Sequence, residues 1–286
     1  MKHLLGKTGY EVFPVAYGGI VSMKDGQTLS DRYVAYAVDH GVNYFDVAPS
    51  YGDAEEKLGN SLKPYRSGVY LACKTEKRLA KDAEVEMANS LKTLHTDHFD
   101  TYQMHGLSSV EDVETAFGPG GVMELMVRMK EQGITRRLGF TAHSEEAALK
   151  AISLYPFDSV LFPFNWHMNL AHGMGNRLMK TVKENGMGVL AMKQLVERAW
   201  YPGEARDEFP KSWCKPISAG DTALRLAAMK FAYSLGADIL IPPGNFECFS
   251  FEVEHAEECL NSPLTDEERQ LLETRLEAVK AYPFFK

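Results

Sequence analysis

Residues 41–52, Gly-Val-Asn-Tyr-Phe-Asp-Val-Ala-Pro-Ser-Tyr-Gly, contain a short apolar run, 43–48, that is followed by turn residues. A continuous apolar run of this length is typical of a strand that is covered on both faces, as in a parallel sheet. Asp46 lies near the end of the run, and Tyr51 lies in the turn that follows. The stretch therefore predicts a buried strand whose carboxyl end carries polar side chains.

Runs of the same kind recur along the chain, which gives eight in total. The other seven are residues 14–18, 69–74, 99–105, 136–141, 157–164, 187–193 and 238–242. Helical patterns fall between them, as where Val122, Leu125, Met126 and Met129 follow the i, i+3, i+4, i+7 spacing of one helix face. Eight such strands with interleaved helices predict an α/β fold, a parallel (β/α)8 barrel of the TIM type. An open doubly wound sheet is the competing layout.

Three further segments extend this barrel. Residues 4–19, LLGKTGYEVFPVAYGG, read as two short arms around Lys7-Thr8-Gly9, which predicts an N-terminal β-hairpin before the first barrel strand. Residues 106–121 and 195–217 are long connections, and loops of this length on a compact scaffold are usually functional. No linker composition interrupts the chain, so we expect residues 1–286 to form a single barrel domain.

The composition excludes several classes of function. The 286 residues include 31 Lys and Arg against 39 Asp and Glu, a formal net charge of −8, so no basic surface for nucleic acid is expected. No apolar run approaches the roughly 20 residues of a membrane helix. The opening MKHLLGKTGYEVF lacks the apolar region of a secretory signal, so we expect a cytoplasmic protein. The cysteines and histidines have no metal-ligand spacing, so no metal site is expected.

Two other patterns have simple structural interpretations. Residues 186–191, GMGVLA, match the letters of a dinucleotide-binding G-x-G-x-x-A motif, but they precede a predicted strand instead of opening a helix. We interpret them as a helix end and turn, which also disfavours the doubly wound alternative. The acidic segment 252–258 predicts a solvated helix face.

Four polar residues fall where three consecutive predicted strands end: Asp46, Tyr51, Lys74 and His105. The carboxyl ends of barrel strands meet at one mouth, so these side chains are expected to converge. A lysine ammonium beside a phenol stabilises the phenolate and lowers a tyrosine pKa from its usual value of about 10. Asp46 would hold Lys74, and His105 would orient a substrate oxygen. Such a group suits protonation of a carbonyl oxygen while hydride reaches its carbon, and the hydride implies a nicotinamide cofactor.

The same residues carry a resemblance to the aldo/keto reductase superfamily. Residues 41–48, followed by Tyr51-Gly52 and by Glu55…Leu58-Gly59, resemble one conserved block of that family. Lys74 and His105 complete its tetrad of Asp, Tyr, Lys and His in the right order. Further similar segments are the N-terminal hairpin, ITRRLGFTAHS (134–144), FPFNWHMN (162–169), GMGVLAMK (186–193) and ILIPPG (239–244).

The resemblance implies a (β/α)8 barrel that binds NADPH or NADH extended across its C-terminal face. Tyr51 would then be the general acid, tuned by Lys74 and Asp46, with His105 orienting the carbonyl. The implied cofactor contacts are Thr141, Asn165, Met192, Lys193, Pro243, Gly244 and Asn245. In NADPH-preferring relatives, basic residues after the eighth strand grip the 2′-phosphate, whereas residues 242–260 contain no Lys or Arg. Family frequency places NADPH first, with NADH close behind.

The leading hypothesis is a carbonyl reductase or alcohol dehydrogenase that acts on a small aldehyde, ketone or alcohol. Trp200, Tyr201 and Trp213 are candidates for the substrate pocket, and Lys193 and Arg198 could attract an anionic or polyhydroxy substrate. One alternative is a cofactor-binding regulatory subunit; another is a non-redox elimination on a sugar-like substrate. The sequence leaves the substrate, the favoured direction and the oligomeric state open.

Overall fold

The computed structural model describes residues 1–285, and its centre is an eight-stranded parallel sheet with the strand order β12-β9-β8-β7-β6-β5-β4-β3. A parallel bridge between Val15 and Leu240 joins the two ends of this sheet, and Ala16 N donates to Leu240 O at 2.9 Å. The strands are β3 (Tyr17–Gly18), β4 (Tyr44–Asp46), β5 (Tyr70–Thr75), β6 (Phe99–Leu107), β7 (Thr135–Ala142), β8 (Ser159–Phe162), β9 (Gly188–Met192) and β12 (Ile239–Ile241). Every predicted run supplies one strand, so the barrel is confirmed and the doubly wound alternative is wrong.

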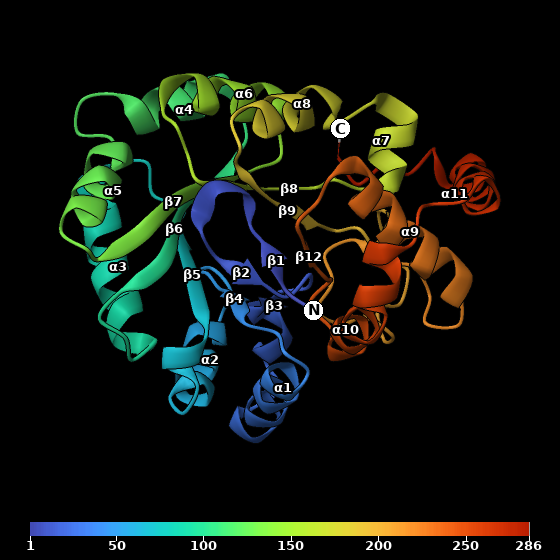
Figure 1. Ribbon diagram of the computed structural model, residues 1–286, viewed down its shortest axis with the longest axis horizontal. Helices are drawn as coiled ribbons and strands as arrows, with labels where there is room; N and C mark the ends of the chain where they lie inside the picture. Colours follow the sequence, from blue (N-terminus) through green and yellow to red (C-terminus); the bar gives the residue numbers. More distant parts are fainter. Residues whose placement is uncertain (286) are drawn as a thin grey trace.

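Helices surround the barrel (Figure 1). They are α1 (Gln27–Asp39), α2 (Ala54–Leu62), α3 (Ala80–Thr93), α4 (Val110–Phe117), α5 (Val122–Glu131), α6 (Glu145–Leu154), α7 (Trp166–His172), α8 (Asn176–Glu184), α9 (Thr222–Leu235), α10 (Phe246–Asn261) and α11 (Asp266–Val279). Around the barrel, α5 lies between α3 and α4. Local chemistry sets their ends, as where Thr265 and Glu268 form a capping box at the start of α11. Gly186, with φ of 64°, lies between α8 and β9, so the GMGVLA motif is a helix end and turn.

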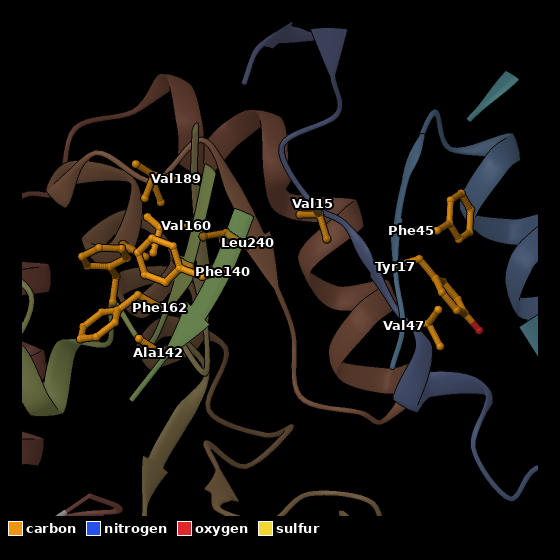
Figure 2. Packing of buried hydrophobic residues seen from close by; sticks show 14 of the residues in the cluster. Val15, Tyr17, Phe45, Val47, Phe140, Ala142, Val160, Phe162, Val189 and Leu240 are labelled. Atoms are coloured by element: carbon orange, nitrogen blue, oxygen red, sulfur yellow. The ribbon is translucent and has the colours of Figure 1, made fainter. Parts of the chain in front are cut away.

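Side chains along each strand alternate between two packed layers. Phe45, Phe140 and Phe162 belong to the outer layer between strands and helices, part of which Figure 2 shows. Their strand neighbours Tyr44 and Leu161 belong to a second cluster inside the barrel. Alternate residues of a strand share a face. In each strand, the residue two positions after a residue of this inner cluster therefore also points into the barrel.

The N-terminal hairpin occupies one end of the barrel. Strands β1 (His3–Leu4) and β2 (Glu11–Val12) pair antiparallel, as predicted, and lie across the centre of the view in Figure 1. Leu5, between them, packs within the inner cluster, and Lys7 N donates to Gly186 O at 2.7 Å. The hairpin therefore covers the end at which the parallel strands begin, and the opposite end is left for a site.

The second long connection, 195–217, lies over that opposite end. It contains the short hairpin of β10 (Val196–Arg198) and β11 (Lys215–Pro216). Lys211 within it donates to Val21 O at 2.7 Å and forms an ion pair with Asp25, both just after β3. These contacts tie the connection to the other side of the barrel mouth.

The prediction of a solvated face at 252–258 is wrong for the start of that segment. Glu252 has no exposed surface, and Gln194 Nε2 donates a hydrogen bond to its carboxyl group. Val253 and Ala256 are buried as well, because this face of α10 packs inward. Only the acids on the opposite face, such as Glu254 and Glu258, are exposed.

Candidate active site

An ion pair between Asp46 and Lys74 lies inside the barrel, where β4 and β5 end. Lys74 has no exposed surface and Asp46 only 2%. Gln103 Nε2 donates to the second carboxylate oxygen of Asp46 at 3.0 Å. Gln103 was not among the predicted residues, although its position two residues before His105 on β6 places both on the same face of the strand.

Tyr51 lies in the turn between β4 and α2, with the Lys74 ammonium 5.3 Å from its ring centroid. Burial raises the pKa of Tyr51, and the opposing effect of Lys74 is smaller. The prediction that Lys74 brings this pKa below its ordinary value is therefore wrong for the protein alone. Burial also disfavours the charged form of Lys74, but Asp46 and Tyr51 outweigh it and raise the pKa of the ammonium. The site thus holds a protonated phenol beside a charged lysine.

His105 completes the group, its ring edge-on to Tyr51 with centroids 5.6 Å apart. Burial, together with the nearby Lys74 and His143, lowers the pKa of His105 to about 2. Its Nδ1 lies 3.3 Å from a carboxylate oxygen of Glu76 without an aligned hydrogen bond. The imidazole is therefore neutral and presents one N–H group.

Two adjoining cavities open beside these residues. The tetrad cavity, of about 220 Å³, is lined by Ser50, Tyr51, Glu76, His105, Thr141, His143, Leu161, Met192, Lys193 and Trp213. The strand-end cavity shares Tyr51, Leu161, Met192, Lys193 and Trp213, and is further lined by Gly18, Ile20, Asp46, Val196, Lys211, Ser212, Cys214, Ile241, Pro242, Pro243 and Gly244. A larger open groove, of about 1080 Å³, lies at the opposite end of the barrel and contains none of the tetrad.

Several of the predicted cofactor contacts line these cavities. Met192 and Lys193 border both, Thr141 borders the tetrad cavity, and Pro243 and Gly244 border the strand-end cavity. Asn245 follows at the start of α10, but its side chain does not cap the helix. The first amides of α10 thus have no side-chain partner, and an uncapped helix N-terminus favours an anionic group such as a phosphate.

Asn165 is fully engaged within the protein. Its Nδ2 donates to Lys193 O at 2.6 Å and to Val196 O at 2.8 Å. Its Oδ1 accepts from the backbone N–H groups of His167 and Met168, which caps α7. A nicotinamide carboxamide could pair with Asn165 only if one of these bonds were given up, so the contact implied by the resemblance has no free donor.

Of the three candidate pocket aromatics, only Trp213 borders the cavities. It is 60% exposed, and its ring centroid lies 6.1 Å from that of Tyr51. Trp200 donates its indole N–H to Ser212 O at 2.9 Å and packs within the connection. Tyr201 stacks on the guanidinium of Arg198, which pairs with Glu204 through two hydrogen bonds. Arg198 is therefore a structural ion pair and faces neither cavity.

Charges at the start of α10 are already paired. Glu247 lies in the first turn of this helix and forms an ion pair with the buried Arg225 of α9. Lys211, which lines the strand-end cavity, pairs with Asp25. Neither cation is left free for a 2′-phosphate group.

Across residues 1–285, no three His, Cys, Asp or Glu side chains gather in a way that could ligate a metal ion. The same part of the chain contains no helix with the length and apolar character needed to cross a bilayer.

Comparisons with known proteins agree with the barrel fold. Residues 22–227 match the model of the aldo/keto reductase family. The aldo-keto reductase YhdN of Bacillus subtilis is 26% identical over 280 residues, with 82% of each chain covered. L-galactose dehydrogenase of Arabidopsis thaliana is 26% identical over 224 residues, with 69% of each chain covered.

The fold is shared with solved structures as well. A holo-form aldo-keto reductase of Bacillus halodurans superimposes with a TM-score of 0.71 at 20% identity, covering 99% of this chain and 97% of that chain. An aldo/keto reductase of Brucella melitensis gives a TM-score of 0.66 at 15% identity, covering 96% and 99%. The barrel and the match over most of its length together show that the chain belongs to the aldo/keto reductase family.

Proposed function

We propose that the protein reduces an aldehyde or ketone to the alcohol, or catalyses the reverse reaction, with NADPH or NADH as the hydride carrier and Tyr51 as the proton donor. The observation that carries this proposal is the position of Tyr51 on the wall between both cavities, beside Lys74 and His105. Membership of the aldo/keto reductase family supports nicotinamide-dependent carbonyl chemistry in general.

Each member of the tetrad then has one role. The neutral imidazole of His105 donates a hydrogen bond that orients the carbonyl oxygen in the tetrad cavity. Tyr51 gives its phenolic proton to that oxygen, and the ammonium of Lys74 stabilises the phenolate left behind. Asp46 and Gln103 position Lys74 and keep it charged despite its burial. The bound nicotinamide supplies the hydride.

The strand-end cavity, of about 90 Å³, runs from Tyr51 towards the uncapped start of α10, and we propose that it receives part of the extended cofactor. Met192, Pro243 and Gly244 line it, with Lys193 at its junction with the tetrad cavity. Thr141 and Asn245 are further proposed contacts. Asn165 would act indirectly, through the backbone carbonyl groups to which it donates. Because Arg225 is occupied by Glu247, we propose that NADH is accepted at least as readily as NADPH.

The test begins with titration of the protein with NADPH and with NADH, and the fluorescence of the nucleotide reports binding. We expect the wild type to bind the nucleotide at micromolar concentration and to turn over a panel of aldehydes and ketones. Tyr51→Phe should lose turnover and retain binding. Nucleotide binding without turnover would favour a regulatory subunit. Product formed without any nicotinamide would favour elimination chemistry, and absence of nucleotide binding would overturn the proposal.

A further inference from the structure

Lys193 differs from the other buried cations of the barrel in its surroundings. Those cations each contact a carboxylate: Lys74 with Asp46, Arg198 with Glu204, Lys211 with Asp25 and Arg225 with Glu247. The half-buried Lys193 ammonium instead lies 3.1 Å from His143 Nε2, 3.5 Å from Met192 Sδ and 4.9 Å from the Phe285 ring centroid. None of these groups is negatively charged, and within residues 1–285 Lys193 forms no ion pair.

The backbone of Lys193 is held in an unusual conformation. Its φ of 64° lies in the left-handed region, which residues other than glycine rarely adopt. The carbonyl oxygen of Lys193 accepts hydrogen bonds from Asn165 Nδ2 at 2.6 Å and from Val196 N at 2.9 Å, which fix this conformation. Strained backbone that the surroundings hold in place is concentrated at functional sites.

An ammonium group with no counter-charge is unfavourable away from water. Desolvation accordingly lowers the pKa of Lys193 to about 8, and it lowers the pKa of His143 to about 4. At neutral pH, a charged Lys193 therefore donates to a neutral His143. Nothing in the described chain compensates the remaining charge, so an anionic ligand would be strongly favoured at this position.

The neighbours of Lys193 indicate which cavity the ammonium serves. Lys193 borders both cavities, and of these two only the tetrad cavity is lined by His143, its closest polar contact, which together with Phe285 also lines a separate open groove. Glu76 also lines that cavity, beside His105, and its side chain is 57% exposed. Its carboxylate would repel an anion at the His105 wall, which leaves the Lys193 wall as the position for a negative group.

We propose that Lys193 binds an anionic group of the substrate, such as a carboxylate, while the substrate's carbonyl group lies at Tyr51 and His105. This inference rests on the proposed function and narrows its substrate class to small carbonyl compounds that carry a negative charge. It also assigns Lys193 to the substrate, whereas the resemblance implies a contact with the cofactor. The apolar remainder of the substrate would lie against Trp213 and Leu161.

The test uses two aldehydes of nearly equal size, para-carboxybenzaldehyde and the neutral para-formylbenzamide. We expect the wild type to favour the carboxylate in kcat/KM, mainly through KM, and Lys193→Met to lower this preference roughly 10- to 100-fold. Lys193→Arg should retain part of the preference. Lys180→Met removes an exposed cation of α8 and should leave the preference unchanged. Equal kcat/KM for the two aldehydes in the wild type would overturn the inference.

Two binding measurements separate this inference from the proposed function. The affinity for para-carboxybenzaldehyde, followed by tryptophan fluorescence, requires no turnover and should fall in Lys193→Met even if the reaction proposed above is wrong. The Kd of NADH and NADPH should change less than threefold in the same variant. A large rise in nucleotide Kd with an unchanged aldehyde preference would assign Lys193 to a cofactor phosphate and overturn the inference.

Discussion

Lys74 and Asp46 form an ion pair that is almost completely withdrawn from water and lies directly beneath the Tyr51 ring. The register of β4 and β5 sets Asp46 opposite Ala72, so Lys74 extends one inward-facing position further along the neighbouring strand. A buried charge is unfavourable unless it is paired and hydrogen-bonded, and Gln103 supplies the remaining partner of the carboxylate. The pair therefore holds a positive charge beside the phenol of Tyr51.

Lys74→Met should destabilise the fold because it leaves the carboxylate of Asp46 buried without a counter-charge. We expect a loss of roughly 3–5 kcal/mol in the free energy of unfolding, measured by urea denaturation. The double variant Asp46→Asn/Lys74→Met removes both charges and should be clearly more stable than the sum of the single losses predicts. Additive losses would show that the two residues do not depend on each other.

Tyr51→Phe should lower the rate of carbonyl reduction by about 10²- to 10⁴-fold, because the general acid is lost while the ring remains. The Kd of the nucleotide should stay within about twofold of the wild type. Since burial raises the pKa of Tyr51, the phenol stays protonated through the neutral range, and its ionisation should produce no fall in the reduction rate there. A variant rate close to that of the wild type would contradict the proton-donor role.

The preference for an anionic aldehyde should decline as the pH rises through about 8, where Lys193 loses its proton. The sign follows from charge: the protonated ammonium below this pH attracts the carboxylate, and the neutral amine above it does not. The two nearby imidazoles titrate far below this range, with the pKa of His105 at about 2 and that of His143 at about 4. Burial raises the pKa of the neighbouring Cys214 thiol. The ratio of kcat/KM for the two aldehydes, measured as a function of pH, checks this prediction. A ratio that does not change with pH would argue against binding of the carboxylate by Lys193.

Glu247→Gln should shift cofactor preference towards NADPH. The change removes the carboxylate partner of Arg225 at the start of α10 and makes its guanidinium available to a 2′-phosphate. A charge-assisted hydrogen bond contributes about 1.5–3 kcal/mol, so we expect the ratio of NADPH to NADH affinity to rise roughly 10-fold or more. Glu258→Gln, a change of the same charge on the exposed face of α10, is the control and should leave the ratio unchanged.

Glu252→Gln should increase stability at neutral and alkaline pH. Burial raises the pKa of Glu252 well above its usual value, so the folded protein holds a proton there that the unfolded chain releases. The stabilisation is therefore complete below the ordinary carboxyl pKa of about 4.3 and is lost as the pH rises above it. Thermal unfolding of wild type and variant across this pH range tests the point: the variant should lack part of the decline.

The sequence alone determined the barrel and the end of it at which Asp46, Tyr51, Lys74 and His105 meet. Apolar runs and helix-end residues act over a few neighbouring positions, so each strand could be identified locally, as could the capping box at Thr265 and Glu268. The four tetrad residues could be assigned because carboxyl ends of parallel strands always meet at one face of the barrel. The same reasoning could have identified Gln103, because the two-residue period of β6 places it on the same face as His105.

Only the tertiary structure decided which polar groups were already paired. Asn165 is used by the backbone of Lys193, and Arg225 is used by Glu247, partners that lie more than twenty residues apart in each case. Glu252 is buried because the α10 face that carries it packs inward. In the sequence, its acidic neighbours instead suggest an exposed face. Hydrogen bonds and ion pairs act over a few ångströms in space, and a local sequence pattern carries no record of which distant side chain comes within that range.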